Sequence, residues 1–292
     1  SPETRDKFLK NMSSRAAEKL RAAISPPYLL KDHVYGTSMS IGIVLFKDHQ
    51  APIDQLLKHA DIAMYHAKAS GRNRYAVYSG RLGEIAERNF LLESRFRDAI
   101  TNNVFRFAYQ RIVDSRLYET RGAEALLRWF DDELGYVPPD QVVALAEELG
   151  FSSELANITV DNAFAFLERH GNDLPATFKL AINLSAEQFS SVGVIDHIIA
   201  RCDAAQTTPP RLEIEITEAT LLIDSRIAQK HIERLAQAGL EVGIDDFGTG
   251  YASLSYLQRY AIKFMKIDRT FTQMIEHRDD HLPIIEVMID LA

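Results

Sequence analysis

The sequence predicts an α/β fold in which a sheet of parallel strands follows a small α+β unit. Six short apolar runs from residue 105 onward are rich in β-branched or aromatic residues and read as strands, with helical patterns between them. Regular alternation of strand and helix gives a parallel sheet, either doubly wound or closed into a (β/α)8 barrel. The 292 residues allow about two domains at roughly 150 residues each.

Composition and charge exclude several classes of protein. Hydrophobic residues make up 46% of the chain and charged residues 25%, which is ordinary for a folded globular protein. The formal net charge of -8 provides no global positive field, so a nucleic acid polymer is not expected as a partner. The single Cys202 suits a reducing compartment, and no apolar run approaches the roughly 18 residues of a membrane span. We expect a cytoplasmic chain, which is compatible with a membrane anchor or sensor domain upstream of it.

The opening unit, residues 1–80, is predicted to hold two helices and two strands. A helix is expected over about 4–24, a buried strand over 38–46, a helix that begins at Asp54 and stops at Gly71, and a short strand over 74–79. Two strands make a thin sheet, so this unit resembles half of a domain. A charged amphipathic helix then forms the connector, at residues 81–100.

The second domain, residues 101–292, carries the alternating pattern. Its strands are expected at 105–113, 122–130, 178–185, 212–217, 241–247 and 264–268, with a long helical region over 139–170. The sequence stops in the helix after the sixth strand. A closed eight-stranded barrel would therefore need two further strands.

Polar residues recur at one end of these apolar strands. They lie in or at the carboxyl ends of four successive strands and in a fifth, and they are Glu124, Asn183, Glu215, Asp245, Asp246 and Lys266. In a parallel α/β sheet this edge is where active sites form.

Carboxylates held side by side repel one another, and a divalent cation offsets that cost. Oxygen ligands without Cys or a paired His suit Mg²⁺ or Mn²⁺ rather than Zn²⁺, and two adjacent aspartates allow one carboxylate to bridge two metals. A single acid at a strand end is more often solvated, a helix cap or an Arg partner, so the repetition carries the inference.

Motifs around these residues resemble a known family. The motifs are EALLR at 124–128, NLS at 183–185, EITE at 215–218, DDFGTG at 245–250 and KID at 266–268. From about residue 89 to 292 the chain resembles the EAL-domain phosphodiesterases of cyclic di-GMP. The opening region resembles the C-terminal half of a GGDEF domain, through SIGI at 40–43 and ADIAMYHAKASGRNR at 60–74, although the GGDEF signature itself is absent from the sequence.

The resemblance implies a (β/α)8 barrel that hydrolyses cyclic di-GMP to linear pGpG with two Mg²⁺ or Mn²⁺ ions per site. The implied metal ligands are Glu124, Asn183, Glu215, Asp245 as the bridge and Asp246. Lys266 would stabilise the phosphate or hold the attacking water, and it forms the implied catalytic set together with Asp246 and Glu124. Arg128 would contact a phosphate, and Gln110 with Leu126 would seat a guanine base.

The resemblance also implies regulation. Glu218 and the loop over 247–251 resemble the segment that couples the dimer interface to the metal site, and apolar and aromatic residues over 253–260 favour a homodimer through the barrel. Lys68 and Arg72 resemble phosphate-contacting positions of GGDEF domains. They would serve a regulatory pocket for a nucleotide such as GTP, or simply a solvated helix end.

Departures from the family pattern leave alternatives open. Arg111 follows Gln110 where the family usually has proline, and the family's next glutamate and glutamine lie beyond this sequence. His277 and His281 are interpreted as solvated surface residues rather than metal ligands. One rival function is a receptor that binds cyclic di-GMP without cleaving it, and another is a relay in which the GGDEF-like unit, with bound GTP, gates the barrel. The complete ligand set on the visible strands favours the enzyme.

Overall fold

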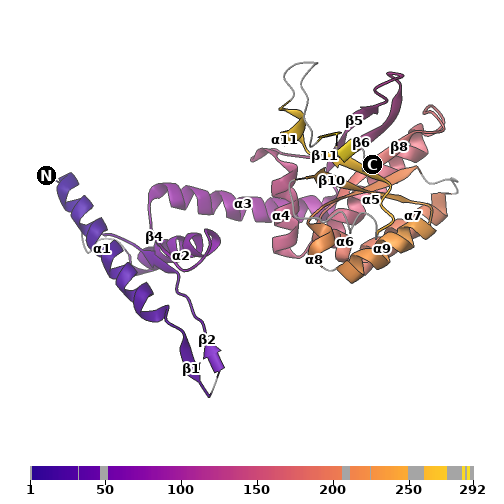
Figure 1. Ribbon diagram of the computed structural model, residues 1–292. Helices are drawn as coiled ribbons and strands as arrows, with labels where there is room; N and C mark the ends of the chain where they lie inside the picture. The colour runs from indigo at the N-terminus through magenta and orange to yellow at the C-terminus, as the bar shows by residue number, and fades with distance from the viewer. Residues whose placement is uncertain are drawn as a thin grey trace. The chain divides into compact units, whose positions relative to one another are not determined.

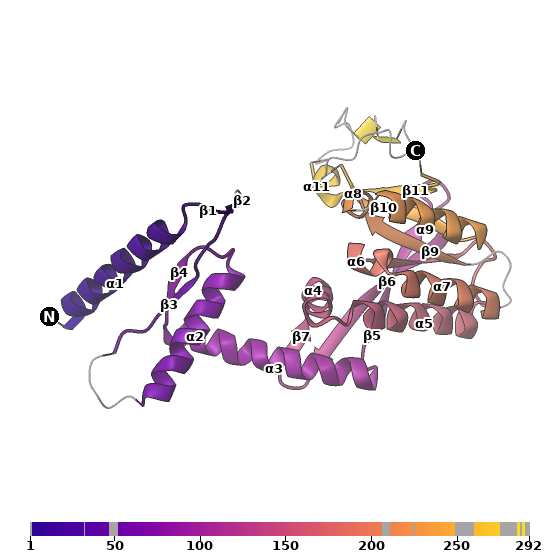
Figure 2. The ribbon, with the colours of Figure 1, turned by 90° about the horizontal axis from the view of Figure 1, so that it is seen from below.

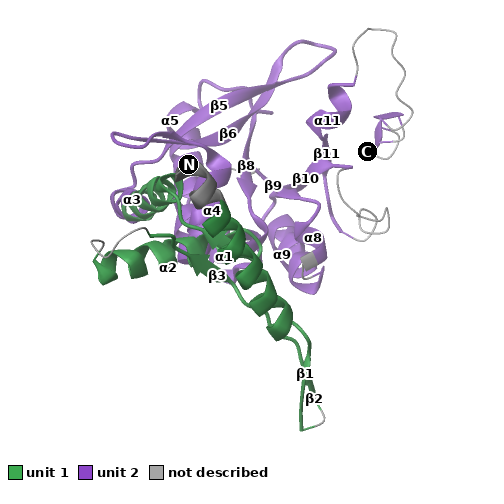
Figure 3. Ribbon diagram, turned by 90° about the vertical axis from the view of Figure 1, so that its left-hand side faces the viewer, with its two compact units in different colours: residues 1–94 green, residues 95–292 purple. Residues whose placement is uncertain are grey.

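A computed structural model describes residues 2–31, 33–46, 52–205, 211–223, 225–248, 260–274, 285–286 and 288–289. The chain divides into two compact units, residues 1–94 and 95–292 (Figure 3). The division falls within one helix, α3 (Gly80–Asn102), which is the helix predicted as the connector (Figure 1). No described helix is both long enough and apolar enough to cross a membrane.

The first unit is a small helix and strand assembly. Its elements are α1 (Pro2–Ile24), β1 (Tyr28–Leu30), β2 (His33–Tyr35), β3 (Ile41–Ile43), α2 (Ile53–Ala69), β4 (Tyr75–Val77) and the start of α3. The predicted strands at 38–46 and 74–79 are shorter here, and they pair with each other in parallel as β3 and β4. Gly42 of β3 lies against α2, where an added Cβ would be 2.0 Å from the carbonyl oxygen of Ala60. The exposed hairpin of β1 and β2 has no counterpart in the prediction, because exposed three-residue strands carry too little apolar pattern.

The second unit is built on one seven-stranded sheet. Its strands are β5 (Arg106–Val113), β6 (Thr120–Asp131), β7 (Gly135–Val137), β8 (Lys179–Leu184), β9 (Leu212–Thr217), β10 (Glu241–Phe247) and β11 (Phe264–Ile267). Its remaining helices are α4 (Pro139–Leu149), α5 (Ser152–His170), α6 (Ala186–Ser190), α7 (Val192–Ala205), α8 (Thr220–Ile223), α9 (Ser225–Gln237) and α11 (Arg269–Thr272). The predicted helical region over 139–170 is two helices, because Gly150 adopts a φ of 74° and ends α4.

The strand order is β11-β10-β9-β8-β6-β5, with β7 paired to β6. The pairs from β6 through β8, β9 and β10 to β11 are parallel, as predicted. The prediction of parallel pairing is wrong for the first strand, since β5 runs antiparallel to β6. The reason is that the connection between them is a tight turn in which Asp114 Oδ1 accepts from the backbone N–H groups of Arg116 and Leu117, whereas a parallel neighbour requires a long crossover.

The two faces of the sheet differ in character. Alternate residues such as Leu180, Ile214 and Val242 are buried in the hydrophobic core beneath α5, α7 and α9, which lie along this face (Figure 2). The intervening residues, including Glu124, Asn183 and Glu215, point to the opposite face, which we call the site face. The alternation of the strands therefore separates the packing residues from the polar ones.

Candidate active site

Three carboxylates from three strands converge on the site face around one lysine. Glu124 of β6, Glu215 of β9 and Asp245 of β10 each offer an oxygen atom within 4.8 Å of the others. Lys266 of β11 lies among them, with its Nζ 2.9 Å from Glu124 Oε2, 2.7 Å from Glu215 Oε2 and 3.4 Å from Asp245 Oδ2. The parallel register places Glu215 directly opposite Gly243, two residues before Asp245, so these side chains gather toward one end of the sheet.

Asn183 completes this group from β8. Its register partner is Glu215, and its Nδ2 atom donates to Glu124 Oε1 at 2.6 Å. This hydrogen bond is made by the amide nitrogen of Asn183, whereas an amide binds a cation through its oxygen, so the bond to Glu124 does not use the atom that would bind a cation.

Burial controls the charges at the centre of the site. The side chain of Glu215 is only 1% exposed, and this burial raises its pKa to about 7, although the Lys266 ammonium opposes the rise. Burial by itself lowers the pKa of Lys266, but its hydrogen bonds to Glu215 and Glu124 outweigh that effect and raise the pKa above its ordinary value. Lys266 is therefore an ammonium ion at neutral pH, which donates hydrogen bonds and cannot accept a proton.

The second aspartate of the pair is displaced from the strand by a bulge. Asp246 has a φ of 54°, and the register between β10 and β11 shifts between Ile244 and Phe247. In a regular strand Asp246 would point toward the core, whereas the bulge lets Phe247 take the buried position instead. Burial and the neighbouring Asp245 carboxylate raise the pKa of Asp246, which also shares a hydrogen bond with Asp268. Asp246 lies outside the group of three converging carboxylates.

The donor set fits a divalent cation. The buried Oε1 atom of Glu215 has no hydrogen-bond partner among the described residues, and an orphaned buried carboxylate oxygen is costly unless a cation or a proton satisfies it. Three carboxylates and an amide, with neither Cys nor His among the ligands, suit a hard cation such as Mg²⁺ or Mn²⁺.

The hairpin of β5 and β6 carries the residues that the sequence analysis associates with substrate. Gln110 lies opposite Glu124, and Leu126 lies opposite Ala108, so all four share the site face. Arg128 lies farther along β6, where its guanidinium donates to the Leu127 carbonyl at 2.8 Å. Gln110 lies beside Glu124 because β5 runs antiparallel to β6. The parallel pairing expected from the sequence does not predict this neighbour.

Glu218 joins the end of β9 to the end of β10. Its side chain is 3% exposed, and its Oε2 atom accepts from the backbone N–H of Gly248 at 3.3 Å. Gly248 has a φ of 100° and follows the aspartate pair by two residues. The rest of the predicted coupling loop and dimer helix, residues 249–259, lies outside the described residues, as do His277 and His281.

Lys68 and Arg72 belong to the other unit. Both are exposed at the C-terminal end of α2, where the backbone N–H of Arg72 donates to the carbonyl of Lys68 at 3.2 Å. Arg72 has a φ of 52°, in the turn that ends the helix.

A second charged group, which was not predicted from the sequence, lies on the site face at the opposite ends of the strands. Lys179 Nζ lies 3.2 Å from Glu241 Oε1, and Glu213 lies directly opposite Glu241. Burial raises the pKa of Glu213 to about 7, with smaller effects from Lys179, which lowers it, and Glu241, which raises it. The signal was present in the run LEIEIT, where Glu213 and Glu215 have the same parity and so share a face.

Comparisons with known proteins give the family. Residues 93–292 match the family model described as "EAL domain", and residues 2–74 match "Diguanylate cyclase, GGDEF domain". Among solved structures, "PaMucR Phosphodiesterase, c-di-GMP complex" shares 32% identity with a TM-score of 0.64, over 69% of this chain and 81% of that one.

Two curated relatives align along nearly the whole chain. The "Bifunctional diguanylate cyclase/cyclic di-GMP phosphodiesterase MucR" of Pseudomonas aeruginosa is 34% identical, over 94% of this chain and 40% of the relative. The "Cyclic di-GMP phosphodiesterase PdeR" of Escherichia coli is 28% identical, over 99% of this chain and 43% of the relative. The chain thus spans less than half the length of these relatives. It belongs to the EAL domain family, with a stretch that matches the GGDEF domain ahead of its EAL domain.

Proposed function

We propose that this protein is a metal-dependent phosphodiesterase that hydrolyses cyclic di-GMP to linear pGpG. The observation that carries the proposal is the convergence of Glu124, Glu215 and Asp245 around Lys266, with one buried oxygen of Glu215 unsatisfied. The names of MucR and PdeR support the choice of cyclic di-GMP as substrate.

Glu124, Asn183, Glu215 and Asp245 would hold the first cation, and Asp245 with Asp246 would hold a second. A bound Mg²⁺ or Mn²⁺ supplies Lewis acidity toward a phosphoryl oxygen and lowers the pKa of a water molecule. Asp246 is suited to a separate cation because the bulge at φ 54° turns it away from the core and out of the first group.

Lys266 acts on the reacting phosphate as a fixed positive charge. Its hydrogen bonds to Glu124 and Glu215, at 2.9 and 2.7 Å, hold the ammonium group among the metal ligands. Such a preorganised donor stabilises the negative charge that develops on phosphate oxygens in the transition state, or orients the attacking water.

The substrate-binding residues extend away from the cations along β6. Arg128 would hold a phosphate oxygen through its guanidinium, and Gln110 and Leu126 would seat a guanine base between the arginine and the metal ligands. Hydrolysis adds water to one phosphodiester: the water oxygen bonds to phosphorus, the P–O3′ bond breaks, and the 3′-oxygen leaves as a hydroxyl.

The direct test is product analysis with purified protein. Cyclic di-GMP incubated with Mg²⁺ should disappear at the rate at which pGpG appears. Tight binding of cyclic di-GMP without pGpG formation would favour the receptor instead and would overturn the enzyme assignment.

Two regulatory proposals go with the enzyme. GTP would bind the GGDEF-like unit near Lys68 and Arg72, which predicts that GTP changes the rate of pGpG formation and that Arg72→Ala removes the change.

The protein would act as a homodimer whose interface controls the loop anchored by Glu218. Activity per protomer that stays constant on dilution through the dimer dissociation range, followed by light scattering, would show that dimerisation is not the control.

A further inference from the structure

The β5–β6 hairpin places two arginines directly opposite each other at its open end. Arg106, the first residue of β5, has Arg128 of β6 as its register partner. Directly opposite residues of an antiparallel pair point to the same face, with Cβ atoms about 5 Å apart. The next pairs along the same face are Ala108 with Leu126 and Gln110 with Glu124. Arg106 is therefore on the site face, beside the residue proposed to hold phosphate.

This pairing is unfavourable without a counter-ion. Like charges directly opposite on adjacent strands destabilise a sheet. Among the described residues, neither guanidinium forms an ion pair with a carboxylate, and the one side-chain hydrogen bond of Arg128 goes to the Leu127 carbonyl. The chain has more acidic than basic residues, 41 against 33, so the lack of a carboxylate beside these two arginines does not come from a shortage of acidic residues. Two unpaired guanidinium groups on one face form a local site for an anion.

The position of the two arginines limits the kind of anion. Arg128 is four residues from Glu124 along β6, which is about 13 Å at 3.3 Å per residue. A ligand that reaches both the arginines and the cation ligands must extend along the hairpin and carry negative charge at both ends. A dinucleotide with two phosphodiesters satisfies both requirements.

We propose that Arg106 is a second phosphate-binding residue, which together with Arg128 holds the phosphodiester of cyclic di-GMP that is not being cleaved. The inference rests on the proposed function and adds a residue to it. Two planar guanidinium groups on neighbouring strands can each donate to a different oxygen of one phosphate, which lysine cannot reproduce in the same geometry.

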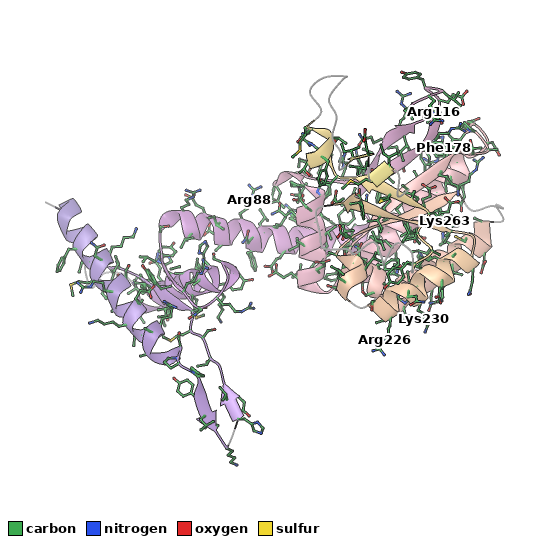
Figure 4. The ribbon with its side chains drawn as sticks, in the orientation of Figure 1. Arg88, Arg116, Phe178, Arg226, Lys230 and Lys263 are labelled. Carbon is green, nitrogen blue, oxygen red and sulfur yellow. The ribbon has the colours of Figure 1, made fainter. Side chains whose placement is uncertain are left out.

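The test compares Arg106→Ala with Arg116→Ala. Arg116, labelled in Figure 4, is an exposed arginine in the turn at the other end of the same hairpin, so its replacement removes the same charge away from the proposed site. Arg106→Ala should raise the KM for cyclic di-GMP about tenfold and leave kcat within about twofold, because a contact to the unreactive phosphate contributes equally in ground and transition states. Arg116→Ala should leave both values unchanged.

Two further measurements separate phosphate binding from a structural role. The KM of the native protein should rise more steeply with KCl than that of Arg106→Ala, since the variant has lost one charged contact with phosphate. Arg106→Lys, which keeps the charge, should recover part of the affinity, and Arg106→Gln should not. Thermal unfolding should show that all these variants are folded.

The outcomes are distinct. A KM for Arg106→Ala within twofold of the native value, in protein that produces pGpG normally, would overturn the role of Arg106 and leave the proposed function intact. A fall in kcat without a rise in KM would also overturn it, because Arg106 would then act on the scissile phosphate. Failure of the native protein itself to bind or cleave cyclic di-GMP would overturn the proposed function, and this inference with it.

Discussion

Lys266 Nζ lies 2.7 Å from Glu215 Oε2, so a cation on β11 is bonded to the most buried carboxylate of the site on β9. The two residues lie on strands separated by β10 in the sheet order, and the bond passes over the site face. This bond holds the Lys266 ammonium among the carboxylates that are proposed to bind cations. The loss of any one charge, from Lys266, Glu124, Glu215 or Asp245, would therefore change the net charge of the site.

The first prediction concerns Glu124. Glu124→Ala should lower the rate of pGpG formation at least about a hundredfold, because it removes a proposed cation ligand and an ion-pair partner of Lys266. The rate is measured by separating pGpG from cyclic di-GMP, and thermal unfolding checks the fold. Glu119→Ala, in the exposed turn of the same hairpin, is the matched control and should keep native activity. A Glu124→Ala protein with a tenth or more of the native rate would contradict the assignment.

The choice of metal gives the second prediction. After treatment with EDTA, activity should return with Mg²⁺ or Mn²⁺ and not with Ca²⁺, which is larger and takes more ligands in a less regular geometry. Ca²⁺ added together with Mg²⁺ should inhibit by competition. Equal rates with Ca²⁺ and Mg²⁺ would show that the geometry of a small octahedral cation is not required.

The third prediction concerns the bond between Glu218 and Gly248. Glu218→Ala removes the acceptor of the Gly248 N–H, two residues beyond Asp246, and should lower kcat about ten- to a hundredfold by displacing the aspartates. Glu218→Gln keeps an oxygen acceptor and should recover part of the rate. If the glutamine and alanine variants are equally impaired, the effect does not come through this hydrogen bond.

The fourth prediction uses the pKa of Glu213, which burial raises from 4.5 to about 7. Between pH 4.5 and about 7, the native state therefore binds more protons than the unfolded state. The contribution of Glu213 to the free energy of unfolding is largest at low pH and is lost as the pH rises through about 7. Glu213→Gln should raise the free energy of unfolding at pH 8 by about 1 kcal/mol relative to its effect at pH 5, a value discounted for solvent screening of this partly exposed group.

Denaturant unfolding at both pH values measures this difference, and Glu119→Gln provides the same substitution on an exposed turn of the same unit. A gain from Glu213→Gln that is larger at pH 5 than at pH 8 would reverse the predicted sign.

The fifth prediction is steric. An added Cβ at Gly243 would lie 2.1 Å from Cε2 of Phe264, so Gly243→Ala should destabilise the protein by about 1–3 kcal/mol and lower activity by shifting Lys266, two residues beyond the phenylalanine. Phe264→Leu in the same protein should restore part of the stability. Gly193→Ala, whose Cβ meets nothing closer than 3.8 Å, should not lower stability, because Gly193 lies in α7, where alanine is at least as favourable as glycine. Equal unfolding temperatures for the two glycine variants would contradict the close-packing argument.

The buried strands can be located from the sequence because a strand with one face in the core shows apolar residues at every second position. The predicted limits of 212–217 and 241–247 match β9 and β10, whose core-facing positions are Ile, Leu or Val along almost their whole length. The gathering of Glu124, Glu215 and Asp245 also follows from parallel register, since corresponding positions of parallel strands meet at one end of the sheet.

Other features depend on backbone geometry that single residues do not reveal. The reversal of β5 is set by a short turn at Asp114, and the position of Asp246 is set by one positive φ, while the sequence shows only two adjacent aspartates. The pairing of Arg106 with Arg128 depends on the antiparallel register, so it appears only once the direction of β5 is known.

The aromatic ring of Phe264 lies against Gly243 on the site face, at the position of β10 between Glu241 and Asp245. One end carries Lys179, Glu213 and Glu241, and the other carries Glu215, Asp245 and Lys266. Because the uncharged Gly243 separates Glu241 from Asp245 along β10, we expect substitutions of Lys179, Glu213 or Glu241 to change the resistance of the protein to heat and acid more than they change its activity.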